Sequence, residues 1–332
     1  MRLRLLISCM AALCSLFSAV AQPAAGRYTS HPGVCAITPR TTLSYEHGLA
    51  PLAGYLRSYI NVATTGESMS ADKAIVLSTD KTLSEEAYRL TVGPDHIEIA
   101  GGAYGGVFNG IQALFRMLPP EVYARKCPLP VEIPCGVTED APRFAYRGMM
   151  LDVARTWIGV SEVKRYIDLF SYHNINKLHL HLSDDEGWRI EIKSHPELTE
   201  IGGIRGGDSP ERPVNGKWTE KYGGYFKQSE MRDLIRYAAE RNIEIIPEID
   251  LPGHSRNIAS VHPEIRCNYP PDTVSTNGYD YRSAWCVARE ENYALLADIL
   301  GELCALFPSE YIHVGGDEVD MTQWNRCPDC QA

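Results

Sequence analysis

Beyond Arg143 the sequence alternates regularly between strand-like and helix-like segments, and this alternation restricts the possible folds more than any other feature. The segment "KLHLHL" (177–182) has the period of two that is typical of a strand. The segment that begins at Ser161, where Ser161 and Glu162 are expected to cap a helix, has helical spacing of apolar residues. The expected strands are 146–154, 177–182, 243–250 and 311–315, and the expected helices are 161–170, 229–242 and 290–307. Strands joined through helices run parallel, so the pattern predicts an α/β fold.

Polar residues gather where each expected strand ends. They are Asp152 and Arg155 after the first strand, Asp184, Asp185 and Glu186 after the second, Glu248, Asp250 and His254 at the third, and Asp317 and Glu318 after the fourth. In a (β/α)8 barrel the loops at the carboxyl ends of the strands build the active site. A doubly wound sheet usually concentrates its ligands at one switch point. Four successive clusters therefore favour a TIM-type barrel with a catalytic or binding cleft at one rim.

The part of the chain before the alternation predicts a separate small α/β domain over residues 22–140. Short strands are expected at 74–78, 88–93 and 96–102, followed by a helix at 105–118. The proline-rich stretch from Pro119 to Arg143 has the composition of a connection. The barrel portion is expected to span residues 143–332.

Residues 1–21 have the pattern of a signal peptide. A basic start, Met1-Arg-Leu-Arg, precedes an apolar run that ends in the small residues "AVA" at 19–21. The apolar run is short for a membrane span, and we expect no membrane span elsewhere in the chain. The protein is therefore expected to be exported. The sequence contains no Asn-x-Ser/Thr site for N-glycosylation, which favours a bacterial periplasm, cell surface or secreted location.

Charge and composition limit the partners. The chain of 332 residues is 44% hydrophobic and 22% charged, which is ordinary globular composition, and its formal net charge is -10. Proteins that bind nucleic acid need basic surfaces that neutralise phosphates. We therefore expect no nucleic-acid partner and an uncharged or polar substrate. The oligomeric state cannot be read from the sequence.

Cysteine usage leaves two alternatives open. The sequence has ten cysteines, and eight remain when Cys9 and Cys14 of the expected signal peptide are set aside. An even number in an exported chain suggests disulfides, and Cys267 with Cys286 would close one loop. The pair in Cys327-Pro-Asp-Cys330 fits a small disulfide loop or half of a zinc site, although one CxxC is a weak signal.

Four ordered blocks resemble the β-N-acetylhexosaminidases of glycoside hydrolase family 20. They are "RGMMLDVAR" (147–155), "NKLHLHLSDDEGWRIEI" (176–192), "IPEIDLPGH" (246–254) and "HVGGDEV" (313–319). A small α/β domain before the barrel is also common in that family. The resemblance implies removal of terminal β-linked N-acetylglucosamine or N-acetylgalactosamine from glycans, with retention at the anomeric carbon and without a cofactor or metal.

The resemblance also implies roles for five residues. Glu318 matches the acid/base and Asp317 the anion that orients the substrate's 2-acetamido group, which is itself the nucleophile in this family. Asp184 and His254 match a relay that tunes the acid/base. Arg155 matches the arginine that holds the sugar hydroxyls. Taken alone, an acidic turn, a loop salt bridge and a loop histidine would each be ordinary structural features.

The pair at 317–318 also needs a turn. Neighbouring side chains on a strand point to opposite faces, so two carboxylates that serve one sugar cannot simply continue the strand. Gly315 and Gly316 are expected to supply the turn. Asp185 and Asp250 suit structural acceptors equally well, and Trp188 is expected in the core.

Two other functions fit single motifs. His179 and His181 share one face of a strand, which resembles a metal-dependent barrel hydrolase, but their position before the strand's end favours core histidines. The letters "GGDEV" resemble a nucleotide-cyclase hairpin, but an exported chain would not meet cytosolic GTP, and the residues that follow are helix-like.

The length predicts only about the first half of a barrel. Residues 144–332 supply four expected strands, whereas a closed barrel needs eight and typically ~250 residues. The family's acetamido pocket is walled by tryptophans from the later strands, and none of the five tryptophans here is placed to match. An open sheet would also expose unpaired edges. An inactive truncated fragment is therefore the alternative to an active enzyme.

Overall fold

The computed structural model describes residues 27–66, 74–208, 219–267, 284–319 and 321–332. It divides into two compact units, Met1–Ala145 and Tyr146–Ala332. The expected signal peptide at 1–21 lies outside the described residues. Among the helices that are described, none is both long and apolar enough to cross a membrane.

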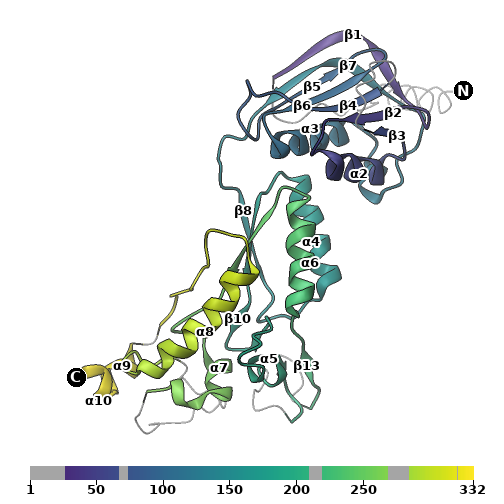
Figure 1. The fold of residues 1–332 in the computed structure, drawn as a ribbon. Coiled ribbons are helices and arrows are strands. Elements are labelled where there is room, and N and C mark those ends of the chain that lie inside the picture. Colours follow the sequence, from purple (N-terminus) through teal and green to yellow (C-terminus); the bar gives the residue numbers. More distant parts are fainter. Residues whose placement is uncertain (1–26, 67–73, 209–218, 268–283, 320) are drawn as a thin grey trace, which may run out of the picture. The chain divides into compact units, whose positions relative to one another are not determined.

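The first unit is a seven-stranded mixed sheet with helices on one face (Figure 1). Its strand order is β1-β7-β5-β6-β4-β2-β3. The elements are β1 (Arg27–Ile37), β2 (Thr42–Tyr45), α2 (Ala50–Tyr59), β3 (Ala63–Gly66), β4 (Ala74–Thr79), β5 (Tyr88–Val92), β6 (Ile97–Gly101), α3 (Tyr104–Met117), the 3-10 turn η1 (Pro120–Ala124) and β7 (Val131–Asp140). Helix α3 packs on the central strands and is buried over most of its length.

The expected strands and the helix between residues 74 and 118 are confirmed, but the expected connection from Pro119 to Arg143 is wrong. Strand β7 occupies much of it and pairs with both β1 and β5. A proline inside a strand argues against a central position because it lacks an N–H. Pro134 is accommodated because it lies beside the register shift between Ser30 and Val34 of β1. Strands β1, β2 and β3 and helix α2 are further elements that the sequence patterns had not indicated.

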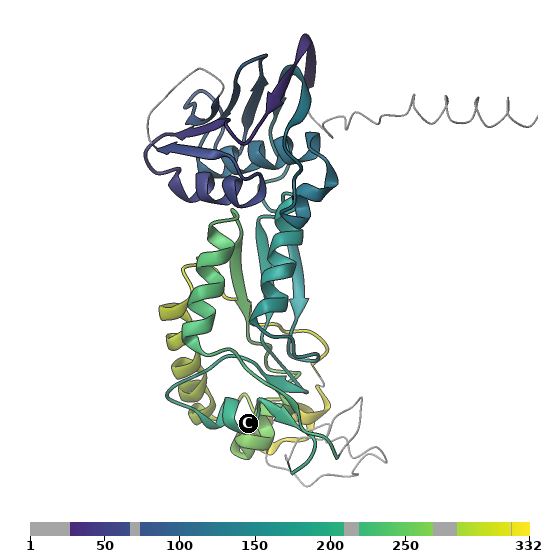
Figure 2. The same ribbon diagram turned by 90° about the vertical axis from the view of Figure 1, so that its right-hand side faces the viewer.

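The second unit is built on a parallel sheet of three strands in the order β14-β9-β8. Its main elements are β8 (Gly148–Asp152), α4 (Val160–Tyr172), β9 (Lys177–His181), α6 (Gln228–Ala239), β14 (Glu244–Glu248) and α8 (Glu290–Leu306). Helices α4 and α6 lie side by side (Figures 1 and 2). Successive strands are neighbours without a reversal of order, as in a barrel and unlike the switch point of a doubly wound sheet.

Shorter elements fill the loops beyond the carboxyl ends of these strands. They are β10 (Ser183–Asp184), β11 (Gly187–Trp188), α5 (Glu197–Glu200), β12 (Ile204–Arg205), β13 (Tyr222–Gly223), α7 (Arg256–Val261), the 3-10 turn η2 (Pro263–Ile265), α9 (Thr322–Arg326) and α10 (Pro328–Gln331). The loops between β9 and β14 thus carry small hairpins and helical turns of their own.

Two sequence expectations in this unit need correction. Helix α4 begins at Val160 after an extended Gly159, and Ser161 is its second residue, bonded to Glu162 rather than to the backbone. The expected fourth strand at 311–315 is reduced to one bridge between Glu248 and His313. The backbone still follows β14, because His313 donates to Pro247 O and Ile249 donates to His313 O. The glycines that follow turn the chain away before a full strand can form.

Candidate active site

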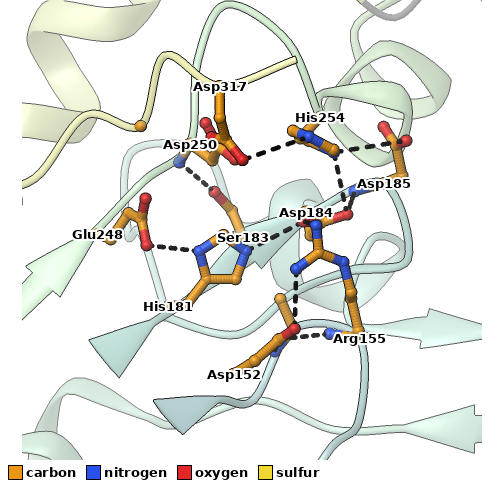
Figure 3. A network of polar contacts seen from close by, with 12 residues as sticks. Asp152, Arg155, His181, Ser183, Asp184, Asp185, Glu248, Asp250, His254 and Asp317 are labelled. Atoms are coloured by element: carbon orange, nitrogen blue, oxygen red, sulfur yellow. Dashed lines mark hydrogen bonds and ion pairs between the residues drawn. The ribbon is translucent and has the colours of Figure 1, made fainter. Parts of the chain in front are cut away.

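The candidate site lies at the carboxyl ends of the parallel strands, where the polar clusters were expected to meet (Figure 3). Asp152 is the last residue of β8, Glu248 is the last residue of β14, and Asp184 follows shortly after β9. The register places Asp152 opposite His181, and His181 opposite Glu248. Parallel pairing therefore brings three ionisable side chains to one edge of the sheet before any loop is considered.

Asp184 is the hub of the network. Its Oδ2 lies 2.7 Å from Arg155 Nη2 and 3.0 Å from His181 Nε2, and its Oδ1 accepts the Asp185 backbone N–H at 2.6 Å. The residue is only 2% exposed. Burial opposes ionisation, but His181, His254 and Arg155 outweigh it and lower the pKa of Asp184. The carboxylate is therefore held ionised.

Behind Asp184, His181 connects it to Glu248. His181 Nδ1 lies 2.5 Å from Glu248 Oε2, and His179 Nε2 lies 2.7 Å from the same oxygen. Burial opposes protonation of His181, but its two carboxylate partners raise its pKa to about 10. The same histidines overcome burial at Glu248 and lower its pKa. The chain of contacts Asp184–His181–Glu248 thus alternates negative, positive and negative charge.

In front of Asp184, His254 faces two pairs of acids. Its Nδ1 lies 3.7 Å from Asp184 Oδ1 and 3.9 Å from Asp185 Oδ2, and its Nε2 lies 3.7 Å from Asp317 Oδ2 and 3.3 Å from Glu318 Oε2. The interaction with Asp184 raises the pKa of His254 to about 9 in spite of partial burial. A protonated imidazole therefore lies between the relay carboxylate and the Asp317–Glu318 pair.

The loop that carries the pair has the turn expected from its glycines. Gly315 and Gly316 have φ of 67° and 107°, and Glu318 has φ of 48°. Left-handed backbone at a residue other than glycine is strained and is typical of functional sites. The side chains of Asp317 and Glu318 are 60% and 79% exposed, so both face open solvent above His254.

Asp250 supports this loop from below. Its Oδ1 accepts the Gly316 N–H at 3.2 Å, and its own N–H is donated to Ser183 Oγ at 3.0 Å. A side chain at Gly315 would place its Cβ 1.7 Å from Asp250 Oδ1, so only glycine fits there. Burial, together with the charge of Asp317, raises the pKa of Asp250 to about 7.

Arg155 is positioned by local and buried contacts. Asp152 accepts the backbone N–H of Arg155 at 2.9 Å and bonds its guanidinium at 3.0 Å. The backbone just before it is held by Arg189, a fully buried side chain whose Nη2 donates to Ala154 O at 2.7 Å. Arg155 is itself partly exposed, so its guanidinium can meet a solute while it pairs with Asp152 and Asp184.

The structure brings all five predicted residues, Arg155, Asp184, His254, Asp317 and Glu318, into one cluster. It also brings in Asp152 and Glu248, which the sequence patterns placed at this rim without a specific role. His181 and Ser183 are further members that the sequence patterns had not singled out as part of the site. The alternation of "HLH" with an acid on the neighbouring strand is the signal that could have found His181. Asp185 accepts the Arg256 N–H at 2.9 Å, and Trp188 lies fully in the core.

Several groups in the described residues have the spacing of metal ligands. One comprises His179, Glu248 and His313, a second comprises Asp184, Asp185 and His254, and a third comprises four cysteines of the same unit. In the first, both histidines already pair with Glu248. All eight cysteines in the described residues carry free thiols, so the disulfides expected from the sequence are not formed in this structure.

Comparison with known protein families matches both units. The model "Glycosyl hydrolase family 20, catalytic domain" matches residues 144–332, and "Glycosyl hydrolase family 20, domain 2" matches residues 22–141. Among curated relatives, a β-hexosaminidase of Vibrio furnissii is 42% identical over 264 residues, which are 79% of this chain and 42% of the relative. An N,N'-diacetylchitobiase of Vibrio harveyi is 32% identical over 72% of this chain and 30% of its own length.

Solved structures give the same result. An exo β-N-acetylglucosaminidase of Vibrio harveyi, solved with N-acetylglucosamine, superposes with a TM-score of 0.83 at 33% identity. It covers 94% of this chain, which spans 49% of that structure. An N-acetyl-β-hexosaminidase of Streptomyces plicatus gives a TM-score of 0.79 at 34% identity over 93% of this chain and 60% of its own. The chain therefore spans about half the length of its relatives, and its parallel sheet corresponds to part of their barrel.

Proposed function

Because this chain belongs to glycosyl hydrolase family 20, we propose that it carries the acid/base half of a retaining β-N-acetylhexosaminidase site. The proposed substrates are glycans that end in β-linked N-acetylglucosamine or N-acetylgalactosamine. The substrate's own acetamido oxygen would displace the leaving group, so the protein needs a proton donor and an orienting anion rather than a nucleophile.

The observation that carries the proposal is the position of His254. Its Nε2 lies 3.3 Å from Glu318 Oε2 while its Nδ1 faces Asp184. Glu318 is proposed to protonate the leaving oxygen and then to accept a proton from water. His254 would be protonated when Glu318 is ionised, and ionised Asp184 would hold the imidazole in orientation.

Asp317 is proposed to orient the acetamido group and to stabilise the positive charge that develops on it. The left-handed backbone at Gly315, Gly316 and Glu318 gives adjacent carboxylates different directions, which a continuous strand would not. Arg155, anchored by Asp152 and Asp184, is proposed to bind the sugar hydroxyls.

The test is hydrolysis of a chromogenic β-N-acetylglucosaminide by the purified chain and by Glu318→Gln. Loss of a general acid should lower kcat/KM by about 10²- to 10⁴-fold for a poor leaving group. The loss should be smaller for a leaving group acidic enough to depart without protonation. Glu310→Gln, an exposed carboxylate on the same segment, is the matched control and should leave the rate unchanged. Equal losses for both leaving groups would contradict the role of Glu318.

An inactive chain is the second candidate, and the open sheet favours it. Among the described residues, strand β8 pairs on one side only, with β9, and its Met149 and Met150 are half exposed. Tyr311 and Val314, beside β14, are exposed as well. Such edges favour association. Folded chain that shows no turnover on any β-N-acetylhexosaminide and that associates with rising concentration would support this candidate over the enzyme.

Export belongs to the same proposal. It is supported by the basic start, the apolar run and the "AVA" of residues 1–21. Mass analysis of the protein from its native cells should find a mature terminus at Gln22 in the periplasm, at the cell surface or in the medium. A cytosolic chain that retains Met1 would contradict export.

A further inference from the structure

Four cysteines from distant parts of the second unit meet at one point. Cys267 follows η2, Cys286 lies shortly before α8, and Cys327 and Cys330 flank the start of α10. Their sulfur atoms all lie within 4.8 Å of one another. Three of the six separations are 3.7 Å for Cys267–Cys330, 3.4 Å for Cys286–Cys330 and 3.9 Å for Cys286–Cys327.

These separations match the edges of a zinc tetrahedron. With Zn–S bonds of about 2.3 Å, sulfur atoms at the corners of a tetrahedron lie about 3.8 Å apart. A disulfide would need an S–S distance of about 2.05 Å, well below each of the three separations. The spacing C-x-x-C at 327–330 is also that of a structural zinc half-site, and Cys267 and Cys286 supply the other half.

The surroundings hold the sulfurs away from water. Cys267, Cys286 and Cys327 are buried, and Cys330 is half buried, with Trp324 packed against the cluster. The Cys286 N–H donates to Ile265 O at 2.7 Å, and Asn292 Nδ2 donates to Cys286 O at 2.8 Å.

We propose that Cys267, Cys286, Cys327 and Cys330 bind one structural zinc ion. The site is closed, with four protein ligands and no position for a substrate, so its function is to hold segments together. It joins the loop that follows β14 to the segment that follows Glu318. Zinc would thereby position the carboxylate loop, and the inference does not depend on which glycan the protein hydrolyses.

The first experiment measures metal and thiols in the full chain purified without chelator. Elemental analysis should find one zinc ion per chain. Peptide mapping without reductant should find these four cysteines as free thiols. Cobalt supplied in place of zinc should give the intense visible absorption of a tetrahedral thiolate site. Two disulfides among the four cysteines with no zinc would overturn the proposal, and iron in place of zinc would overturn the choice of ion.

Variants then assign the ligands. Cys330→Ser should lose zinc, whereas Cys330→His should retain it, because imidazole also binds zinc in tetrahedral sites. Cys304→Ser, at an exposed position on α8, is the matched control and should keep one zinc ion. Should Cys330→Ser fail to fold, the zinc content of Cys330→His and the cobalt spectrum of the parent chain still test whether the four cysteines bind the metal. A Cys330→Ser chain that keeps its full zinc, or a Cys304→Ser chain that loses it, would contradict the assignment.

Discussion

The two units of this protein bury different kinds of polar side chain. In the described residues of the first unit the buried polar side chains are all uncharged: Thr41, Ser44, Ser78, Asn109, Gln112 and Thr138. Apart from cysteines, the part of the second unit that the structure describes buries nine ionisable side chains: His181, Asp184, Asp185, Arg189, Arg205, Arg241, Glu248, Asp250 and Arg256. Both units also bury many apolar side chains, so they differ in whether ionisable side chains are buried beside them.

This difference indicates that the core of the first unit serves stability alone, whereas the core of the second unit also supports a functional site. A buried charge is costly unless it is paired and hydrogen-bonded, and an apolar replacement of a whole pair is often no less stable. His181, Asp184 and Glu248 form one connected network at the strand ends, together with the partly exposed Arg155. Networks that shift several pKa values in this way are typical of functional sites. The first unit has no comparable network among its described residues.

The largest expected effect comes from breaking the network at its buried histidine. His181→Leu should destabilise the second unit by about 3–5 kcal/mol, because it leaves Glu248 and Asp184 buried without their shared partner. All five tryptophans of the chain lie beyond residue 146, so urea unfolding followed by tryptophan fluorescence reports on this unit alone.

The matched change in the first unit is Gln112→Met. Gln112 is fully buried and its Nε2 donates to Tyr55 Oη at 3.0 Å, so the change removes one neutral hydrogen bond and should cost about 1 kcal/mol. Hydrogen exchange of β5 and β6 measures this cost. If His181→Leu and Gln112→Met lowered the free energy of unfolding equally, the buried charges of the second unit would matter no more than the neutral hydrogen bonds of the first.

A smaller effect is expected at the turn that carries the carboxylates. Gly315→Ala introduces a Cβ that collides with Asp250, and it should cost about 1–3 kcal/mol and displace Asp317 and Glu318. Activity should fall about 10²-fold through misplacement of the reacting groups. Gly48→Ala in the first unit is the control, since its φ is 91° but nothing lies within 4 Å of the added Cβ. That variant should show backbone strain alone, about 1–2 kcal/mol, with unchanged kcat.

The smallest effect is a dependence of stability on pH. The pKa values of His181 and His254 are raised to about 10 and about 9 in the folded chain, above the usual value near 6.5. Their contribution is complete below about pH 6.5 and is lost as the pH rises through 9 and 10. Each of the two histidines should therefore lower the free energy of unfolding by up to about 1.4 kcal/mol per pH unit between pH 7 and 9.

Urea midpoints by tryptophan fluorescence at several pH values measure this slope. Asp184 and Glu248, whose pKa values are lowered, act in the opposite direction, since their contribution is present above about pH 4 and is lost on further acidification. The His181→Leu variant should have a shallower slope above pH 7. A slope that this variant leaves unchanged would show that the network does not control stability.

The spacing of apolar residues in the sequence was enough to predict those helices and strands that have a regular pattern. Strands β4, β5, β6, β9 and β14 and helices α3, α6 and α8 lie within a few residues of the predicted ranges. The prediction failed where prolines or glycines interrupt the pattern of a strand. The prolines of β7 led to the prediction of a connection, and consecutive glycines shortened the expected fourth strand to a single bridge at His313. At β7, pairing with the distant strands β1 and β5 decided the outcome, and a local pattern contains no information about those partners.

The sequence by itself determined the family, the type of fold and the five clustered residues, because residue type and order along successive strands are local properties that place each cluster at a strand end. Only the tertiary structure decided which groups meet. It linked His181 to Glu248 and Asp184 behind the candidate relay, turned His254 toward Glu318, and brought Cys267 and Cys286 to Cys327 and Cys330. The physical reason is that charge pairing and metal-ligand geometry act over a few ångströms, between residues that the chain separates widely and only the folded backbone brings together.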